Sequence, residues 1–161
     1  MRRFDREVID IEEIESLILQ CSIVRLGLVE NNKAYIVPMN YGYQRDGEAL
    51  TFYLHSAPVG RKIELLKEVE SITFEMDEAL TIHEDEVRCS TTTEYISVMG
   101  EGRVRFVEAI DEKKRGLDLL LERYGFEGPF SFNESVFNRV CVFKIEVTSI
   151  TGKKNPRHKH Q

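Results

Sequence analysis

The sequence predicts a mainly β fold, a small antiparallel barrel of about six strands with helices packed around it. Two features of the chain predict it. Segments that alternate between apolar and polar residues recur at short spacing, as half-buried strands do. Helical periodicity appears only near the start, in the middle and late in the chain, rather than after every strand, and this pattern disfavours a parallel βαβ sheet.

The first elements follow from capping and turn chemistry. Residues 11–20 are expected to form a helix, because Asp10 begins a capping-box pattern and apolar residues recur behind it at helical spacing. Residues 22–29 alternate loosely and form the first strand. This strand turns at Asn31-Asn32, since asparagine tolerates the left-handed conformation that a tight turn needs. The next strand contains Pro38, which has no N–H to donate, so we expect it at a sheet edge or locally irregular.

The stretch 35–62 is the most informative part of the chain. Two alternating segments flank Asp46-Gly47, a dipeptide that suits the tight turn of a hairpin. A short polar residue then precedes Pro58, and this order predicts that a helix begins near that proline. Arg61 and Lys62 would lie in its first turns, where free N–H groups and two cations meet beside a strand end. The stretch therefore predicts a phosphate-binding site.

The middle of the chain is expected to contain two more strands. Residues 71–76 alternate as a half-buried strand, whereas residues 77–90 are charged and weakly patterned, so we expect a loop there. Residues 91–107 are rich in β-branched and aromatic side chains, but Gly100 and Gly102 interrupt them. This combination indicates one long strand that is bent at a bulge or a close approach.

The last third is expected to contain a helix, a short helical turn and a strand. A helix is expected between Asp111, which would be its N-cap, and Gly125, which would end it. Residues 133–137 suit a short turn of helix, and residues 140–150 alternate as the final strand.

Length and composition limit the domain organisation. A chain of 161 residues with 42% hydrophobic residues fits one domain, which we expect over residues 1–152. The basic segment 153–161 is expected to be a mobile tail. Its His158 and His160 lack the supporting shell that a specific metal site needs, so no metal site is predicted.

Composition also disfavours several classes of protein. No run of about 18 apolar residues could span a bilayer, and no apolar segment typical of a signal peptide follows the first residues, so we expect a cytoplasmic protein. The formal net charge of −6 disfavours nucleic acid as a partner. Cys21, Cys89 and Cys141 are odd in number and widely spaced, which disfavours disulfides and a zinc knuckle.

Two motifs carry a resemblance to a known family. The patterns V-P-x-x-Y-G-Y, from Val37, and F-Y-x-H-S-A-x-x-G-R-K, from Phe52, resemble those of the FMN-binding split barrels related to pyridoxamine 5′-phosphate oxidase. The most similar branch is that of the nitroimidazole-resistance reductases. Matches at Tyr95-x-Ser97-Val98 and near both ends extend the resemblance over nearly the whole chain. The resemblance implies a six-stranded antiparallel split barrel and a homodimer with FMN between its protomers.

The resemblance also implies roles for particular residues. Arg61 and Lys62 would hold the FMN phosphate, and Ser56 would cap the helix and donate to the same phosphate. His55 is the one catalytic candidate, near the flavin, with a structural histidine as the alternative. Tyr41 becomes a cofactor contact, whereas Tyr43 is expected in the core. The cofactor-binding candidates are Val37, Pro38, Met39, Asn40, Tyr41, His55, Ser56, Arg61, Lys62, Tyr95 and Ser97, of which Pro38, Met39 and Asn40 would act mainly through their backbone groups.

Two functions from different classes remain open on the sequence. In the first, FMN accepts hydride from NADH or NADPH and passes electrons to a small planar acceptor such as a nitroimidazole or another nitroaromatic compound. In the second, the barrel binds FMN, haem or another tetrapyrrole as a sensor or carrier without turnover. A deazaflavin in place of FMN is a further alternative. The physiological acceptor and the choice between NADH and NADPH do not follow from the residues.

Overall fold

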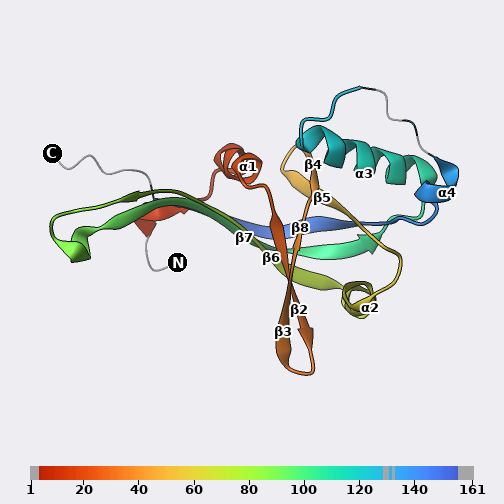
Figure 1. Cartoon of the computed structure of the whole chain (residues 1–161), viewed down its shortest axis with the longest axis horizontal. Coiled ribbons are helices and arrows are strands. Elements are labelled where there is room, and N and C mark those ends of the chain that lie inside the picture. The colour runs from red at the N-terminus through yellow and green to blue at the C-terminus, as the bar shows by residue number, and fades with distance from the viewer. Residues whose placement is uncertain (1–3, 129–130, 132, 156–161) are drawn as a thin grey trace.

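The computed structural model describes residues 4–128, 131 and 133–155, and these form a curled antiparallel sheet with helices around it (Figure 1). The sheet has eight strands in the order β3-β2-β6-β7-β8-β5-β4, and β1 pairs with β8. The strands are β1 Glu7–Val8, β2 Val24–Glu30, β3 Lys33–Met39, β4 Gly42–Asp46, β5 Ala49–Ser56, β6 Ser71–His83, β7 Thr92–Phe106 and β8 Cys141–Asn155. The helices are η1 Phe4–Arg6, α1 Ile11–Gln20, α2 Arg61–Lys67, η2 Arg88–Ser90, α3 Ile110–Arg123 and α4 Glu134–Phe137.

This architecture confirms the predicted mainly β class and its antiparallel sheet. Phe52, Phe74 and Phe143 are fully buried inside the curl, and the rings of Phe52 and Phe74 meet edge to face at 5.2 Å. The structure has eight strands rather than six. One extra strand is the two-residue β1. Another arises because the predicted strand that contains Pro38 and precedes the Asp46-Gly47 turn divides into β3 and β4, which pair with different neighbours.

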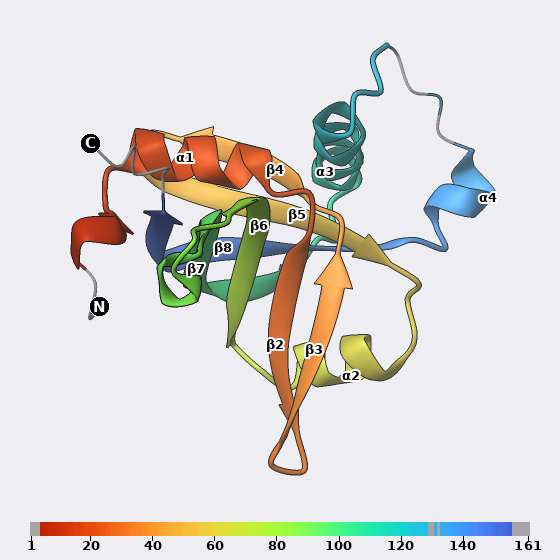
Figure 2. The ribbon, with the colours of Figure 1, turned by 60° about the vertical axis from the view of Figure 1, so that its left-hand side comes forward.

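The two predicted hairpin turns are confirmed. Asn31 and Asn32 both have positive φ, 51° and 59°, and they join β2 to β3. Gly47, at φ 61°, joins β4 to β5. Pro38 lies in β3, which is an edge strand as its missing N–H required. The β2–β3 hairpin projects from the sheet beside α2 (Figure 2).

The segment 77–90, expected as a loop, is the largest correction. Strand β6 continues to His83, because β7 pairs with it from Asp77 opposite Ser97 to His83 opposite Thr92, with one shift of register between Ala79 and Thr81. The far end of the β6–β7 hairpin extends away from the other elements (Figure 1). Since neither face of this end packs against a core, its side chains need not alternate between apolar and polar.

The long strand over residues 91–107 is confirmed as β7, and its register shifts between Glu101 and Gly102. A Cβ atom at Gly102 would lie 2.4 Å from Ile145 Cγ2. The glycine is therefore required by close approach at the bulge, as predicted.

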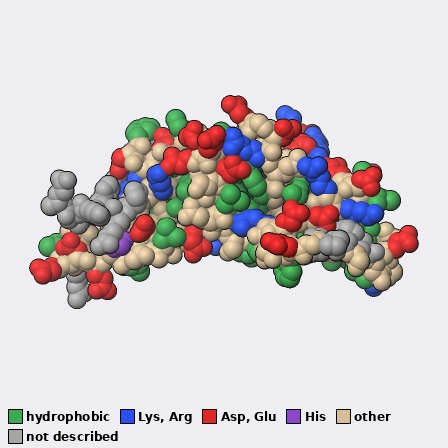
Figure 3. Space-filling view, turned by 90° about the horizontal axis from the view of Figure 1, so that it is seen from above, with side chains coloured by type: hydrophobic (Ala, Val, Ile, Leu, Met, Phe, Trp, Pro, Cys, Tyr) green, Lys and Arg blue, Asp and Glu red, His purple; other side chains and the backbone are tan. Residues whose placement is uncertain are grey.

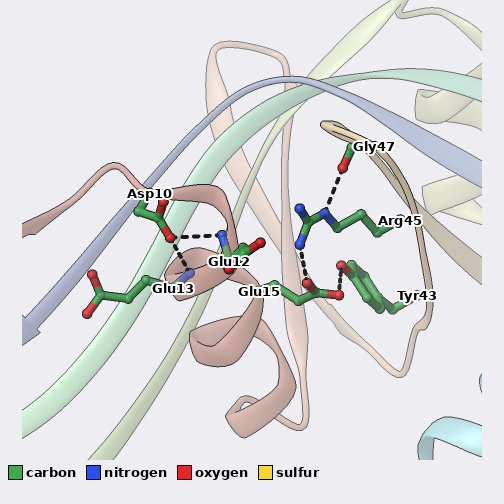
Figure 4. A network of polar contacts seen from close by, with 7 residues as sticks. All are labelled: Asp10, Glu12, Glu13, Glu15, Tyr43, Arg45 and Gly47. Carbon is green, nitrogen blue, oxygen red and sulfur yellow. Dashed lines mark hydrogen bonds and ion pairs between the residues drawn. The ribbon is translucent and has the colours of Figure 1, made fainter.

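Helix α1 begins where predicted, because the Asp10 carboxylate accepts from the N–H groups of Glu12 and Glu13 at 3.1 and 2.9 Å (Figure 4). Helix α2 begins at Arg61, three residues after the predicted start at Pro58. Its N-cap is Gly60 at φ 128°, and no side chain caps it.

Helix α3 packs against β4 and β5, and its predicted position is confirmed. It begins at Ile110, so Asp111 lies in its first turn rather than at the cap, and Gly125 follows it at φ 80°. A Cβ atom at Gly42 would lie 2.6 Å from the backbone nitrogen of Leu120, so a glycine is needed for this close packing.

The C-terminal boundary also differs from the prediction. Residues 153–155 belong to β8 rather than to a tail, because Lys153 pairs with both Glu7 and Ser97, and Asn155 pairs with Tyr95. Asn155 is 2% exposed. The rest of the expected tail, with His158 and His160, lies outside the described residues. Within the described part, none of the helices has the length and apolar character needed to cross a membrane.

Candidate functional site

The end of β5, the start of α2 and the end of β3 bring three predicted residues together. Lys62 Nζ lies 4.0 Å from Met39 Sδ, and the Lys62 charge acts on His55. Among the described residues, no carboxylate oxygen lies within ion-pair distance of the Lys62 amine. A half-buried cation without a carboxylate partner is suited to an anionic ligand.

His55 is the penultimate residue of β5 and pairs with Val142 of β8. Partial burial lowers the pKa of its imidazole, and the positive charge of Lys62 lowers it further. The ring is therefore neutral at pH 7, with one nitrogen that donates and one that accepts. Solvent still reaches the ring, so it is open to a ligand.

Arg61 is directed elsewhere. Its Nη2 donates to Glu30 Oε2 at 2.5 Å, and its Cζ lies 4.1 Å from the centre of the Tyr35 ring. The side chains of Arg61 and Lys62, which were predicted to share one phosphate, thus extend from the same helical turn in different directions. The sequence offered no local signal for Glu30 or Tyr35 at this site, because they come from the β2–β3 hairpin and approach Arg61 only in the fold.

Ser56 is the last residue of β5, pairs with Cys141 and is half-buried. It does not cap α2, whose N-cap is Gly60. Since consecutive strand residues face opposite sides, Ser56 and His55 do not share a face of β5.

The candidates in residues 37–41 alternate between the inside and the surface. Val37 and Met39 are buried, whereas Pro38 and Asn40 are exposed. The edge position of β3 leaves one side of its backbone without a neighbouring strand. This segment therefore packs Val37 and Met39 into the core while its backbone stays accessible to a ligand.

Tyr41 is in the core, where its side chain is unavailable to a ligand at the surface. It is 0% exposed, and its hydroxyl lies 2.7 Å from the carbonyl oxygens of both Ile18 and Cys21. Burial raises the pKa of Tyr41 to about 12. The sequence motif did not distinguish a ring that contacts a cofactor from one that binds the end of α1.

Tyr43 is half-buried and joins the polar network of Figure 4, which ties α1 to the β4–β5 hairpin. Its hydroxyl donates to Glu15 Oε1 at 2.6 Å, and Arg45 Nη1 donates to Glu15 Oε2 at 2.5 Å. Arg45 Nε also donates to the Gly47 carbonyl at 2.7 Å. The hydrogen bonds from Tyr43 and Arg45 lower the pKa of Glu15. This network holds the hairpin whose second strand carries His55.

Tyr95 and Ser97 lie at the other end of the sheet. Tyr95 is opposite Asn155 on β8, whereas His55 is opposite Val142 on the same strand. Thirteen residues of extended strand span about 40 Å, so Tyr95 and His55 of one chain do not meet at one ligand.

The Tyr95 hydroxyl accepts from Arg6 Nη1 at 3.4 Å, and Lys153 Nζ lies 5.2 Å from the centre of its ring. Burial favours the neutral phenol, but the hydrogen bonds and charges of Lys153 and Arg6 outweigh it, so the pKa of Tyr95 is lowered. Lys153 was expected in the tail, and its place in β8 puts a cation beside Tyr95.

An apolar groove of about 310 Å³ lies on the outer side of the sheet. Ile36 of β3 and Met99 of β7 line it, and each is 54% exposed. The other lining residues are Arg25, Gly27, Thr73, Phe74 and Glu75. Hydrophobic side chains are also exposed at the centre of the face in Figure 3, between charged groups of both signs. Within the described part of the chain, no group of three His, Cys, Asp or Glu side chains gathers in a way that would hold a metal ion.

Comparison with known proteins gives a family and a fold. A protein-family model of pyridoxamine 5′-phosphate oxidase matches residues 10–154. A crystal structure of a protein assigned to 5-nitroimidazole antibiotic resistance, from Bacteroides thetaiotaomicron, is 33% identical, with a TM-score of 0.80, and the match covers 92% of this chain and 86% of that one. The search of curated proteins found no match.

Two more distant structures share the fold. A flavocytochrome from Azotobacter vinelandii has a TM-score of 0.79 over 98% of this chain and 72% of its own, at 15% identity. An FAD- and haem-binding protein from Mycobacterium smegmatis has a TM-score of 0.80 over 97% of this chain and 76% of its own, also at 15% identity. The family model and the 33% identical structure go further than fold: the chain belongs to the pyridoxamine 5′-phosphate oxidase family.

Proposed function

We propose that this protein is an FMN-dependent oxidoreductase that uses NADH or NADPH to reduce a small planar acceptor such as a nitroimidazole or another nitroaromatic compound. The observation that carries the proposal is the Lys62 amine, which has no carboxylate partner among the described residues and lies between the neutral imidazole of His55 on β5 and Met39 at the end of the edge strand β3. The similarity to a protein assigned to 5-nitroimidazole resistance supports the choice of acceptor.

The residues present fit the phosphate end of a flavin mononucleotide. Lys62 would hold the phosphate by a charge-assisted contact. Arg61 would become a further donor only by leaving Glu30, and the Ser56 hydroxyl only from the end of β5, because it does not share the face of His55. The backbone of residues 37–40, on the open side of β3, would contact the ring system. When bound, FMN would supply the hydride and electron chemistry that no side chain here provides.

His55 would position the acceptor or the cofactor rather than transfer a proton. A neutral imidazole has one donor and one acceptor nitrogen, so it can orient a nitro or carbonyl group without adding a second cation beside Lys62. Tyr41 would contribute only through its backbone, because its ring is buried.

We also propose a homodimer that completes the site. Tyr95 and Ser97 of β7 pair with the far end of β8, too far from Lys62 to reach a flavin there in their own chain, so only a second protomer could bring them to it. The exposed Ile36 and Met99 provide an apolar surface that a second protomer would cover.

The test starts from purified protein. We expect a yellow sample whose flavin absorbance bleaches when NADPH or NADH is added without oxygen, and recovers when a 5-nitroimidazole is added. Mass spectrometry of the ligand released on denaturation should identify FMN. Loss of the nitro absorbance should accompany recovery of the flavin band.

A second candidate is a non-catalytic flavin- or haem-binding protein, and the structural similarity to a flavocytochrome and to an FAD- and haem-binding protein favours it. A Soret band in the purified sample, or bound flavin that neither NADH nor NADPH reduces, would select this candidate and exclude the first.

A further inference from the structure

Arg61 is already engaged by two residues of the β2–β3 hairpin. Its guanidinium donates to Glu30 Oε2 at 2.5 Å and stacks over the Tyr35 ring at 4.1 Å. Glu30 is the last residue of β2 and Tyr35 lies in β3, so both belong to the projecting hairpin beside α2 (Figure 2). Lys62, from the same helical turn, is directed instead at Met39.

This ion pair contributes little to folding, because solvent reaches 53% of the Arg61 side chain and 35% of Glu30. It matters more for an anionic ligand. A guanidinium donates up to five hydrogen bonds, but a phosphate that recruits it here must displace the Glu30 carboxylate or accept a like charge next to itself. Lys62 has no such competitor among the described residues.

We propose that Glu30 is a positioning residue that holds Arg61 against the hairpin and thereby weakens the binding of the flavin phosphate. The proposal rests on the proposed function, because it concerns the phosphate of the same cofactor. Arg61 has two alternative anionic partners, Glu30 and the phosphate, and FMN affinity reflects the competition between them. Tyr35 keeps the guanidinium over the hairpin in either case, so Arg61 changes partner without leaving its aromatic neighbour.

The experiment compares FMN with riboflavin, which lacks the phosphate. Both are titrated, by quenching of flavin fluorescence, into flavin-free wild type, Glu30→Gln, Arg61→Met and the double variant. We expect Glu30→Gln to tighten FMN binding roughly threefold to tenfold, because the exposed Arg61 guanidinium then has no competing carboxylate and can contact the phosphate. Riboflavin affinity should stay unchanged, and the gain for FMN should vanish in the Arg61→Met background.

Glu48→Gln is the matched control, because it makes the same change of charge at an exposed position in the β4–β5 turn. Its FMN affinity should equal that of wild type. An unchanged affinity in Glu30→Gln, an equal gain for riboflavin, or a gain that persists without Arg61 would each overturn the role of Glu30 while the flavin function stands.

A wrong flavin assignment would give a different result from a wrong role of Glu30. If neither wild type nor any variant binds FMN, the flavin assignment is wrong, and titration with inorganic phosphate then decides the role of Glu30. The Arg61 Nε–Hε resonance should respond at lower phosphate concentration in Glu30→Gln than in wild type. An identical response in the two proteins would overturn the positioning role as well.

Discussion

The electrostatic interaction between His55 and Lys62 sets the charge of the candidate site. Burial is the main cause that lowers the pKa of His55, and the charge of Lys62 lowers this pKa further. The pair therefore carries one positive charge near pH 7. Arg61 adds little to that charge, because Glu30 neutralises it within 2.5 Å. The site should therefore depend on Lys62 more than on Arg61.

Reversing the charge of Lys62 should remove most of the affinity for FMN. A charge-assisted contact to phosphate is worth about 1.5–3 kcal/mol, so Lys62→Glu should weaken binding by an order of magnitude or more. Arg61→Glu should weaken it less. Lys67→Glu, at the exposed end of the same helix, is the matched control and should bind FMN as wild type does. Equal losses in all three variants would point to a non-specific effect of net charge.

The pH dependence of His55 is a second prediction at this scale. Its NMR titration midpoint should lie below the ordinary value of 6.5, and Lys62→Met should move it upward but not fully, because burial remains. Since the folded state then binds fewer protons than the unfolded state, stability should fall as pH drops through about 6.5. His55→Gln should lose less stability between pH 7 and pH 5 than wild type, as measured by urea unfolding. A midpoint at or above 6.5 contradicts the assignment.

At the scale of elements, the end of α1 is held by Arg123, the last residue of α3, and by Tyr124, which follows it. Arg123 Nη2 donates to the carbonyl oxygens of Leu19 and Cys21 at 2.9 and 2.7 Å, and the Tyr124 hydroxyl donates to that of Ser22 at 2.5 Å. The last carbonyls of a helix have no partner within it, so Arg123 satisfies the carbonyl of Leu19, and it shares the Cys21 carbonyl with the Tyr41 hydroxyl. The ends of two helices far apart in sequence are thereby joined.

Removing this link should destabilise the fold. Arg123→Met keeps much of the side-chain volume but loses the donors, so we expect a loss of about 1–3 kcal/mol in the free energy of unfolding. Arg115→Met, at an exposed position of the same helix, should change the stability far less. Chemical denaturation of both variants measures the difference, and similar stabilities would show that solvent replaces Arg123 at no cost.

Elements with their own local signal were predictable from the sequence, and elements that depend on a distant partner were not. The cap at Asp10, the Asn31-Asn32 turn and the bulge near Gly102 all follow from neighbouring residues. Residues 77–83 carry no clear alternation and became a strand only because β7 lies beside them. The start of α2 was misplaced, because Gly60 supplies its cap through backbone conformation rather than a side chain.

For the whole molecule, the prediction to test is assembly. Ile36 and Met99 are exposed in an apolar groove on the outer side of the sheet, and Tyr95 is remote from His55 in the same chain. Both observations support a second protomer over this side of the sheet. A motif reports residue types and not which copy of the chain supplies them, so the contact of Tyr95 with the flavin stays a prediction that depends on this dimer.

Placing a charge in the groove should separate the protomers. Met99→Lys should shift the protein from dimer to monomer in sedimentation velocity and reduce FMN binding, with little change in the melting temperature of the dilute protein. Ile110→Lys, at the exposed start of α3, is the control and should leave the dimer intact. A wild-type monomer that binds FMN at full stoichiometry would contradict the shared site.

Strand β8 is the last described element in the sequence, yet it lies inside the sheet between β7 and β5. The barrel cannot close until this strand has arrived, so the folding nucleus must include contacts between distant parts of the chain, and folding should be slow for a protein of this size. Until then β5 and β7 each present an unpaired edge, and the unfinished chain is open to aggregation. Expression at low temperature or with chaperones should therefore raise the yield of folded protein more than a stabilising substitution on the surface would.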